Sequence, residues 1–197
     1  SLTVSFSLDM STLPKSPFTD VVAGSWYFDA ALYASSHNLM LGTSPTEFSP
    51  NITMTRGMLV TVLYRMNRSP SVSGKTPFTD VRTDEWYSAA VLWAYQNGIV
   101  TGTGSTSFSP DAKVTREQLA AILYRYAQYK KLDTDAGAKL DSFSDAGNVS
   151  GYASEALSWA VSEGLINGAS GRLMPKGDAT RAQVAAILHR FVENVMD

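Results

Sequence analysis

One pattern of residues occurs three times along this chain, and it limits the folds that the chain can form. In each copy a Phe, a Thr or Ser and an Asp stand together, and a Thr-Arg pair follows so that 36 residues separate the Asp from the Arg. The copies cover residues 18–67, 78–127 and 143–193, and residues 1–17 form an N-terminal tail. Repetition at fixed spacing predicts three copies of one supersecondary unit.

Each copy is predicted to contain two helices. The first begins at an aromatic residue, and apolar residues follow at helical spacing, as in Trp86, Ala90, Trp93 and Ala94 of the second copy. Its predicted end is a residue that tolerates a left-handed backbone, which is Asn38, Gly98 or Gly164.

The second helix is predicted to begin after a Thr that acts as its N-cap. We expect these helices over Arg56–Met66, Arg116–Tyr126 and Arg181–Phe191. Two of them also have the spacing of a capping box, in which Gln118 and Gln183 complete the cap. Each carries an apolar stripe that a two-helix unit is too small to bury alone. We therefore predict one all-α domain, with three two-helix repeats in pseudo-threefold arrangement around a central three-helix bundle.

The composition excludes several classes of function. The 197 residues include no Cys, which excludes disulfides, thiolate zinc sites and cysteine nucleophiles. A net charge of −2 gives the whole chain no general attraction to nucleic acid. No apolar run approaches the roughly 20 residues of a membrane helix, so no membrane insertion is expected. Because the chain begins at Ser1 rather than Met, we expect it to be a processed or excised segment.

The motifs resemble those of the S-layer homology family, and residues 78–127 are the nearest match. This copy contains Phe-Thr-Asp-Val, then Trp-Tyr, Asn-Gly-Ile, a Gly, Phe-Ser-Pro and Thr-Arg-Glu-Gln. The resemblance implies a non-catalytic anchor at the surface of bacteria, attached to an upstream surface protein. It implies that three modules of one chain form a pseudo-trimer. Grooves between the modules would bind secondary cell-wall polysaccharide that carries pyruvate ketals, with no cofactor and no metal.

Three arginines are the first candidates for contact with such a ligand: Arg56, Arg116 and Arg181. Each occupies the first turn of a predicted second helix, where unpaired N–H groups and the helix dipole favour an anion. A guanidinium adds a planar fork that fits a carboxylate. The alternative is a structural ion pair with the Asp of the same copy, and one Arg can serve both roles.

Three aromatic residues are the second set of candidates: Trp26, Trp86 and Tyr152. Each can stack on the apolar face of a sugar, although packing of the loop onto the helix is the favoured interpretation. Trp93 and Trp159, further along the same helices, are predicted to be core residues.

Conserved spacing also selects an Asp and a Gly in each copy. Asp20, Asp80 and Asp145 are candidates for contact with sugar hydroxyls, but capping of the following turn is the favoured role. Gly42, Gly102 and Gly168 are predicted to have unusual backbone angles, and access to the groove is a second explanation.

Three function classes are compatible with these residues: a carbohydrate-binding anchor, a protein–protein assembly module and a hydrolase of wall polymer. The hydrolase is disfavoured because catalysis needs one asymmetric constellation, whereas the polar residues here recur three times. The two His residues, His37 and His189, occupy non-equivalent positions and support no metal site. The copies also differ, so we expect unequal grooves, with Arg116 and Trp86 in the most family-like site.

Overall fold

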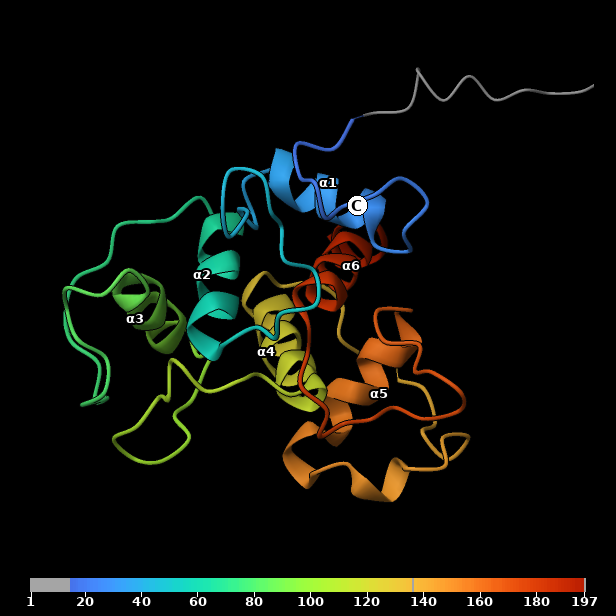
Figure 1. The fold of residues 1–197 in the computed structure, drawn as a ribbon. Helices are drawn as coiled ribbons and strands as arrows, with labels where there is room; N and C mark the ends of the chain where they lie inside the picture. Colours follow the sequence, from blue (N-terminus) through green and yellow to red (C-terminus); the bar gives the residue numbers. More distant parts are fainter. Residues whose placement is uncertain (1–14, 136, 197) are drawn as a thin grey trace, which may run out of the picture.

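The computed structural model describes residues 15–135 and 137–196. The first helices of the three copies are α1 (Phe28–Ser36), α3 (Ser88–Gln96) and α5 (Ser154–Ser162). The second helices are α2 (Arg56–Met66), α4 (Arg116–Tyr129) and α6 (Arg181–Phe191). Short 3₁₀ segments precede α5 (Ala146–Asn148, Gly151–Ala153), and a π-helical turn follows α6 (Val192–Met196). The described residues contain isolated β-bridges but no strand, which confirms the all-α class (Figure 1).

The helix ends follow the predicted capping chemistry. The side chains of Thr55, Thr115 and Thr180 each accept a hydrogen bond from the backbone N–H three residues further on. The capping box is complete at Thr115 and Thr180, as predicted. The residues after the first helices have positive φ: Asn38 (55°), Gly98 (68°) and Gly164 (67°).

The predicted starts of the first helices were wrong by two residues. Each helix begins two residues after its aromatic. Hydrogen bonds between residues three apart, such as that from the Phe28 N–H to the Ser25 carbonyl (3.0 Å), close a tighter turn there. The aromatic therefore belongs to the turn and not to the helix.

Each first helix packs against the second helix of the preceding copy rather than against its own partner. The helix pairs are α2 with α3, α4 with α5, and α6 with α1 (Figure 1). The last helix of the chain thus contacts the first, and the three copies are interlocked. No single copy contains a complete packing unit, which explains why the apolar stripes need all three. The pseudo-threefold arrangement of the copies remains a prediction.

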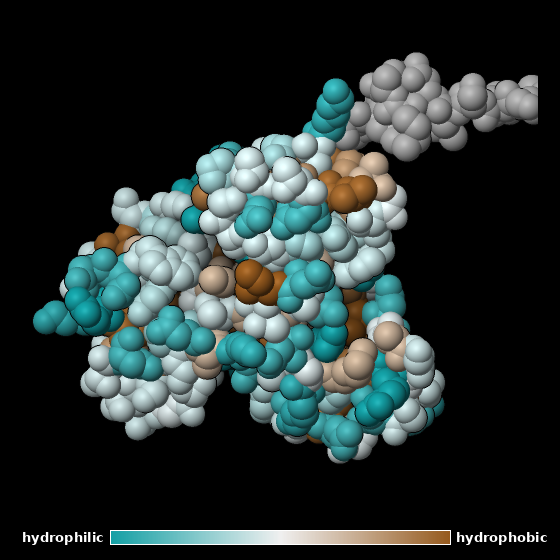
Figure 2. Space-filling model, in the orientation of Figure 1, coloured by the Kyte–Doolittle hydropathy of each residue, from teal (hydrophilic) through white to brown (hydrophobic). Residues whose placement is uncertain are grey.

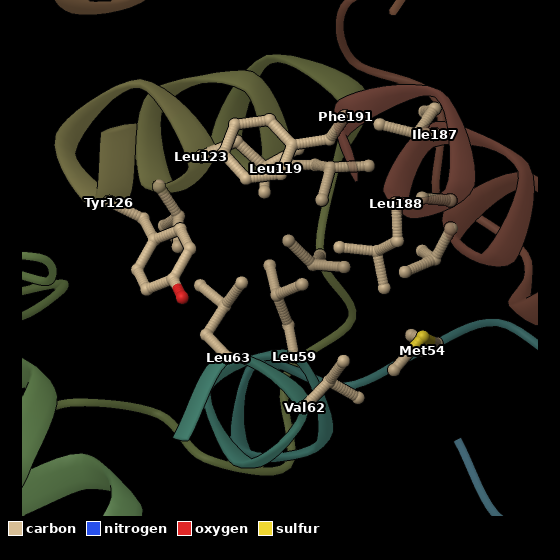
Figure 3. Close-up of a cluster of buried hydrophobic side chains, with 14 of the residues drawn as sticks. Met54, Leu59, Val62, Leu63, Leu119, Leu123, Tyr126, Ile187, Leu188 and Phe191 are labelled. Atoms are coloured by element: carbon tan, nitrogen blue, oxygen red, sulfur yellow. The ribbon is translucent and has the colours of Figure 1, made fainter. Parts of the chain in front are cut away.

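The second helices contribute the centre of the core. Figure 3 shows Leu59 and Leu63 of α2, Leu119 and Leu123 of α4, and Leu188 and Phe191 of α6, whose side chains point toward one another. All six side chains are buried. The predicted central cluster of the three apolar stripes is therefore present. Trp93 and Trp159 are buried as well, as predicted.

A closed ring of three backbone hydrogen bonds joins the copies beside this core. The Met54 N–H donates to the Ala179 carbonyl, the Ala179 N–H donates to the Val114 carbonyl, and the Val114 N–H donates to the Met54 carbonyl, each at 2.9 Å. Each residue comes just before the N-cap of a second helix. The ring consequently fixes the three helix N-termini close to one another, and the Arg residues that follow lie at the boundaries between copies.

Candidate functional site

The Asp of each copy fixes the end of the long loop between the two helices. Asp20 accepts hydrogen bonds from the N–H groups of Phe48 (2.8 Å) and Ser49 (2.7 Å), and Asp80 and Asp145 do the same for the equivalent residues. The second residue of each pair has positive φ, as at Ser49 (56°), which non-glycine residues adopt at a cost. The Asp is thus a capping residue, as predicted, but it caps a loop that lies 28 residues further along the chain and not the turn that follows it.

The Gly of each copy is required by space more than by backbone angle. A Cβ at Gly42 would stand 2.6 Å from the Phe18 ring and 2.7 Å from the Glu47 carbonyl oxygen. Gly102 and Gly168 are crowded in the same way by Phe78 and Phe143. Only Gly168 among the three has positive φ (69°), so the predicted unusual angle was wrong for Gly42 and Gly102.

Two of the three candidate arginines tie neighbouring copies together. Arg56 donates from Nε to the Phe108 carbonyl (2.9 Å) and from Nη2 to the Thr101 carbonyl (3.1 Å). Arg181 donates to the equivalent carbonyls of Phe48 (2.7 Å) and Leu41 (2.5 Å) in the first copy. The predicted ion pair with the Asp of the same copy is absent from both. These arginines are inter-repeat clamps, and burial lowers the pKa of both guanidinium groups.

The helix N-termini are not open to an anion, contrary to expectation. The N–H groups of Arg56 and Gly57 donate to the Ala112 and Pro110 carbonyls of the next copy (2.9 and 2.8 Å). The first two N–H groups of α4 and α6 are used in the same way, and the capping Thr accepts from the third residue. Any anion in these grooves must therefore be bound mainly by side chains.

Arg116 departs from the clamp arrangement. Its half-buried guanidinium has no hydrogen bond and no ion pair within residues 15–135 and 137–196. Burial lowers its pKa but leaves it charged at neutral pH. A Cβ at Gly177 would lie 2.5 Å from its Nη1. The equivalent positions opposite Arg56 and Arg181 are Ala112 and Ile52. Gly177 thus leaves space for the Arg116 guanidinium at a place where Ala112 and Ile52 have a side chain of their own beside Arg56 and Arg181.

The three candidate aromatics are exposed rather than part of the core. Trp26, Trp86 and Tyr152 are 65%, 58% and 56% exposed. The favoured interpretation as packing residues was therefore wrong. Trp26 and Trp86 stand edge-on against the next residue, Tyr27 or Tyr87, at 5.3 and 5.1 Å between ring centroids. Figure 2 shows the most hydrophobic residues as a few separate patches on a face that is otherwise neutral to hydrophilic.

The arginines and the aromatics meet in three grooves, and each groove uses residues of all three copies. Groove 1, of about 80 Å³, is lined by Met40, Leu41, Met58, Arg65, Trp86 and Arg181. Groove 2, of about 350 Å³, is lined by Arg56, Thr101, Gly102, Gln118, Arg125 and Tyr152. Groove 3, of about 180 Å³, is lined by Trp26, Arg116, Asn167, Gly168, Gln183 and Arg190.

This arrangement corrects the predicted pairing. Arg116 lines the same groove as Trp26, whereas Trp86 lines groove 1 with Arg181. The reason is the interlocking of the copies, because each groove combines an Arg from one copy with a loop from the next and an aromatic from the one after. Contacts of this kind follow from tertiary structure and not from spacing along the chain.

The sequence interpretation missed a second arginine in every groove. Arg65, Arg125 and Arg190 each stand nine residues after the candidate Arg of the same helix, on roughly the opposite side of that helix, so the two arginines of one helix line different grooves. Arg190 donates to the Leu165 carbonyl (3.1 Å), but Arg65 and Arg125 have no such partner among the described residues. The recurrence of this Arg in all three copies was the sequence signal that could have identified it as a groove residue.

Two further observations concern membrane spans and metal sites. No helix in the described part of the chain is long and apolar enough to cross a membrane. The described residues also contain no group of three or more His, Asp or Glu side chains arranged to bind a metal ion. The grooves instead offer cationic and aromatic side chains from three interlocked helical repeats. The fold and the grooves together define a helical repeat domain with grooves between its repeats.

Comparison with known proteins gives the family. The model of the S-layer homology domain matches residues 17–57, 77–120 and 142–185. The chain is 31% identical to an amylopullulanase of Thermoanaerobacterium thermosulfurigenes over 181 residues, which are 89% of this chain and 9% of that protein. It is 31% identical to the surface-layer 125 kDa protein of Lysinibacillus sphaericus over 158 residues, or 78% of this chain and 13% of the relative.

The chain belongs to the S-layer homology domain family. It spans less than a fifth of the length of these relatives. S-layer homology domains are non-catalytic modules that anchor surface proteins to the cell wall, outside the cell. The enzymes among the relatives match this chain only in that separate region.

Proposed function

We propose that grooves 1 to 3 bind secondary cell-wall polysaccharide and recognise the carboxylate of its pyruvate ketals. In each groove the exposed aromatic ring stacks on the apolar face of a sugar. The arginines of the groove donate to the carboxylate, since a guanidinium fork matches its two oxygens. The chain performs no catalysis on the polymer and acts as the anchor of a larger protein.

The half-buried guanidinium of Arg116 is the observation that carries this proposal. A charged group that has left bulk water without a partner is costly, and binding of an anion offsets that cost. Arg116 has no such partner within the described residues and lies in groove 3 with the exposed ring of Trp26. An acidic sugar supplies both the carboxylate and the apolar face that this pair fits.

The grooves are not equivalent in this proposal. In groove 3 the Arg116 guanidinium is available to a ligand, whereas Arg56 in groove 2 and Arg181 in groove 1 already donate two hydrogen bonds each. Groove 1 is also the smallest of the three and is lined by Met and Leu side chains. We therefore assign the tightest carboxylate binding to groove 3, with groove 2 as a second site.

Several sites on one interlocked domain suit a repetitive polymer. When one groove is occupied, the next sugar unit is presented to a neighbouring groove at high effective concentration. A single chain is sufficient for this multivalency, because its three copies already form the grooves. The rest of the larger protein, attached upstream, is then displayed at the cell surface.

Calorimetric titration with purified pyruvylated wall polysaccharide tests the proposal. We expect binding by the wild-type chain and a loss of roughly tenfold to hundredfold when Arg116 is replaced by Gln, equivalent to about 1.5–3 kcal/mol. Arg116→Lys should recover part of the affinity, because Lys keeps the charge and loses the fork.

The control ligand is the same polysaccharide after its pyruvate groups have been removed, which should bind weakly to every variant. Equal affinity for both forms of the polymer would refute recognition of the carboxylate. Concentration-dependent self-association without any binding of polysaccharide would support the assembly class instead.

A further inference from the structure

Groove 2 lacks the aromatic pair that supports the exposed ring in grooves 1 and 3. Trp86 and Trp26 stand against Tyr87 and Tyr27, but the residue after Tyr152 is Ala153. Tyr152 also lines both groove 2 and an adjoining hollow of about 230 Å³. With space on two sides and no neighbouring ring, its position over the groove needs another support.

Glu117 provides that support at the second position of α4. Its side chain is 4% exposed and accepts a hydrogen bond from the Tyr152 hydroxyl (3.2 Å). It also accepts from the Ser150 N–H (3.0 Å) and hydroxyl (2.9 Å) and pairs with Lys176 (2.6 Å), whose Nζ contacts the Ser150 hydroxyl as well. A buried carboxylate with this many donors is well compensated. Glu117 therefore fixes the loop before α5, together with the ring that the loop carries.

The other two copies cannot use this device. The positions equivalent to Glu117 are Gly57 and Ala182. A Cβ at Gly57 would already lie 3.3 Å from the Tyr87 ring, so the supporting ring and an acidic side chain compete for one space. The copies thus support their exposed rings in two different ways, and only the junction between the second and third copies uses a carboxylate.

The ionisation of the two groups agrees with this contact. Burial raises the pKa of Tyr152, and the negative charge of Glu117 adds to the effect, so the pKa is about 12. Burial would raise the pKa of Glu117, but hydrogen bonds from Lys176 and Ser150 outweigh it and hold that pKa below its ordinary value. At neutral pH the pair is therefore a carboxylate that accepts from a neutral phenol.

We infer that Glu117 is a positioning residue that holds the Tyr152 ring over groove 2 and so sets the affinity of this groove for a sugar. The inference rests on the proposed function for the identity of the ligand. Because the Tyr152 hydroxyl donates its one hydrogen to Glu117, the ring offers a sugar its face and can no longer donate a hydrogen bond to it. Groove 2 then selects sugars mainly by stacking beside Arg56 and Arg125.

The test uses a chain in which Trp26→Ala and Trp86→Ala leave Tyr152 as the only groove aromatic. In this background, Glu117→Ala should lower the affinity for pyruvylated wall polysaccharide by on the order of fivefold in a calorimetric titration. Glu117→Gln should retain part of the affinity because it keeps an acceptor for Tyr152. The matched control is Glu155→Gln, which removes a carboxylate from the adjoining hollow and should change nothing. Unchanged affinity in Glu117→Ala would overturn the inference.

A second readout separates positioning from the proposed function. The ring carbon signals of tyrosine in NMR spectra, assigned through Tyr152→Phe, report the ionisation of each phenol. The pKa of Tyr152 should be lower in Glu117→Gln than in the wild-type chain, because the variant removes the negative charge while the burial of the phenol remains. An unchanged titration would refute the contact with Glu117. Failure of the wild-type chain to bind polysaccharide would refute the proposed ligand, while the titration would still decide whether Glu117 controls Tyr152.

Discussion

Replacement of Arg56 and Arg116 by Ala separates the two roles that an Arg has in this domain. The two residues occupy the same position of α2 and α4, at the first turn of the helix. Arg56 is buried, donates to the Phe108 and Thr101 carbonyls, and lies over the Phe108 ring at 4.7 Å from its centroid. Arg116 makes no hydrogen bond or ion pair in the part of the chain that the structure describes. Each of the two variants is thus a control for the other.

The magnitude follows from these contacts. Each hydrogen bond from a charged donor contributes about 1.5–3 kcal/mol, and its loss in Arg56→Ala also leaves a buried carbonyl without a donor. Arg56→Ala also removes the cost of burying a charged guanidinium, which offsets part of the loss of the two hydrogen bonds. We therefore expect a net loss of about 3 kcal/mol in the free energy of unfolding. Arg116→Ala should cost less than about 1 kcal/mol.

Thermal unfolding followed by circular dichroism measures the difference. In a domain of this length about 1 kcal/mol changes the melting temperature by roughly 2–4 °C, so Arg56→Ala should melt roughly 6–12 °C below the wild-type chain. Arg181→Ala should behave like Arg56→Ala, since it has the same clamp. Equal losses of stability in Arg56→Ala and Arg116→Ala would refute the division into clamp and ligand residue.

Three further predictions concern the core, the loop and pH. Tyr126→Phe should leave the free energy of unfolding unchanged or raise it by up to about 1 kcal/mol, as measured in urea titrations. The buried Tyr126 hydroxyl has no hydrogen-bond partner among the described residues, and the third copy has Phe191 at the equivalent position. Gly102→Ala should lower the melting temperature, since its Cβ would stand 2.8 Å from the Phe78 ring. The folded chain holds the pKa of Glu117 below its unfolded value of about 4.3, so the ionised carboxylate adds stability above that pH. This stability is lost as the pH falls through the folded pKa. Glu117→Gln should therefore lose less stability on acidification than the wild-type chain does.

Local features of the fold could be predicted from the sequence because they depend on neighbouring residues. The apolar stripe of each second helix, the Thr caps and the residues with positive φ all lie within one or two helical turns of the feature that they determine. The class of the fold followed, since three incomplete units with matching stripes must share one core. The resemblance of residues 78–127 to one family supplied the rest of the interpretation.

The site was less predictable because its contacts join distant parts of the chain. Arg181 donates to carbonyls 133 and 140 residues away, and no pattern of spacing shows that its guanidinium faces the first copy. The same interlocking places Trp26 rather than Trp86 with Arg116. The difference at Glu117, where the other copies have Gly or Ala, was visible and contributed to the expectation of unequal grooves, but it did not show that Glu117 contacts Tyr152.

The side-chain Nε–Hε signal of Arg116 in NMR spectra tests the central claim most directly. It reports contact at the guanidinium to which we assign the tightest binding of the ligand carboxylate, and the signals of Arg56 and Arg181, which already donate to backbone carbonyls, serve as internal references. Addition of a pyruvylated fragment of wall polysaccharide should shift the Arg116 signal, and the same fragment without pyruvate should not. No shift at Arg116 while the fragment binds, or equal shifts with both fragments, would contradict the account.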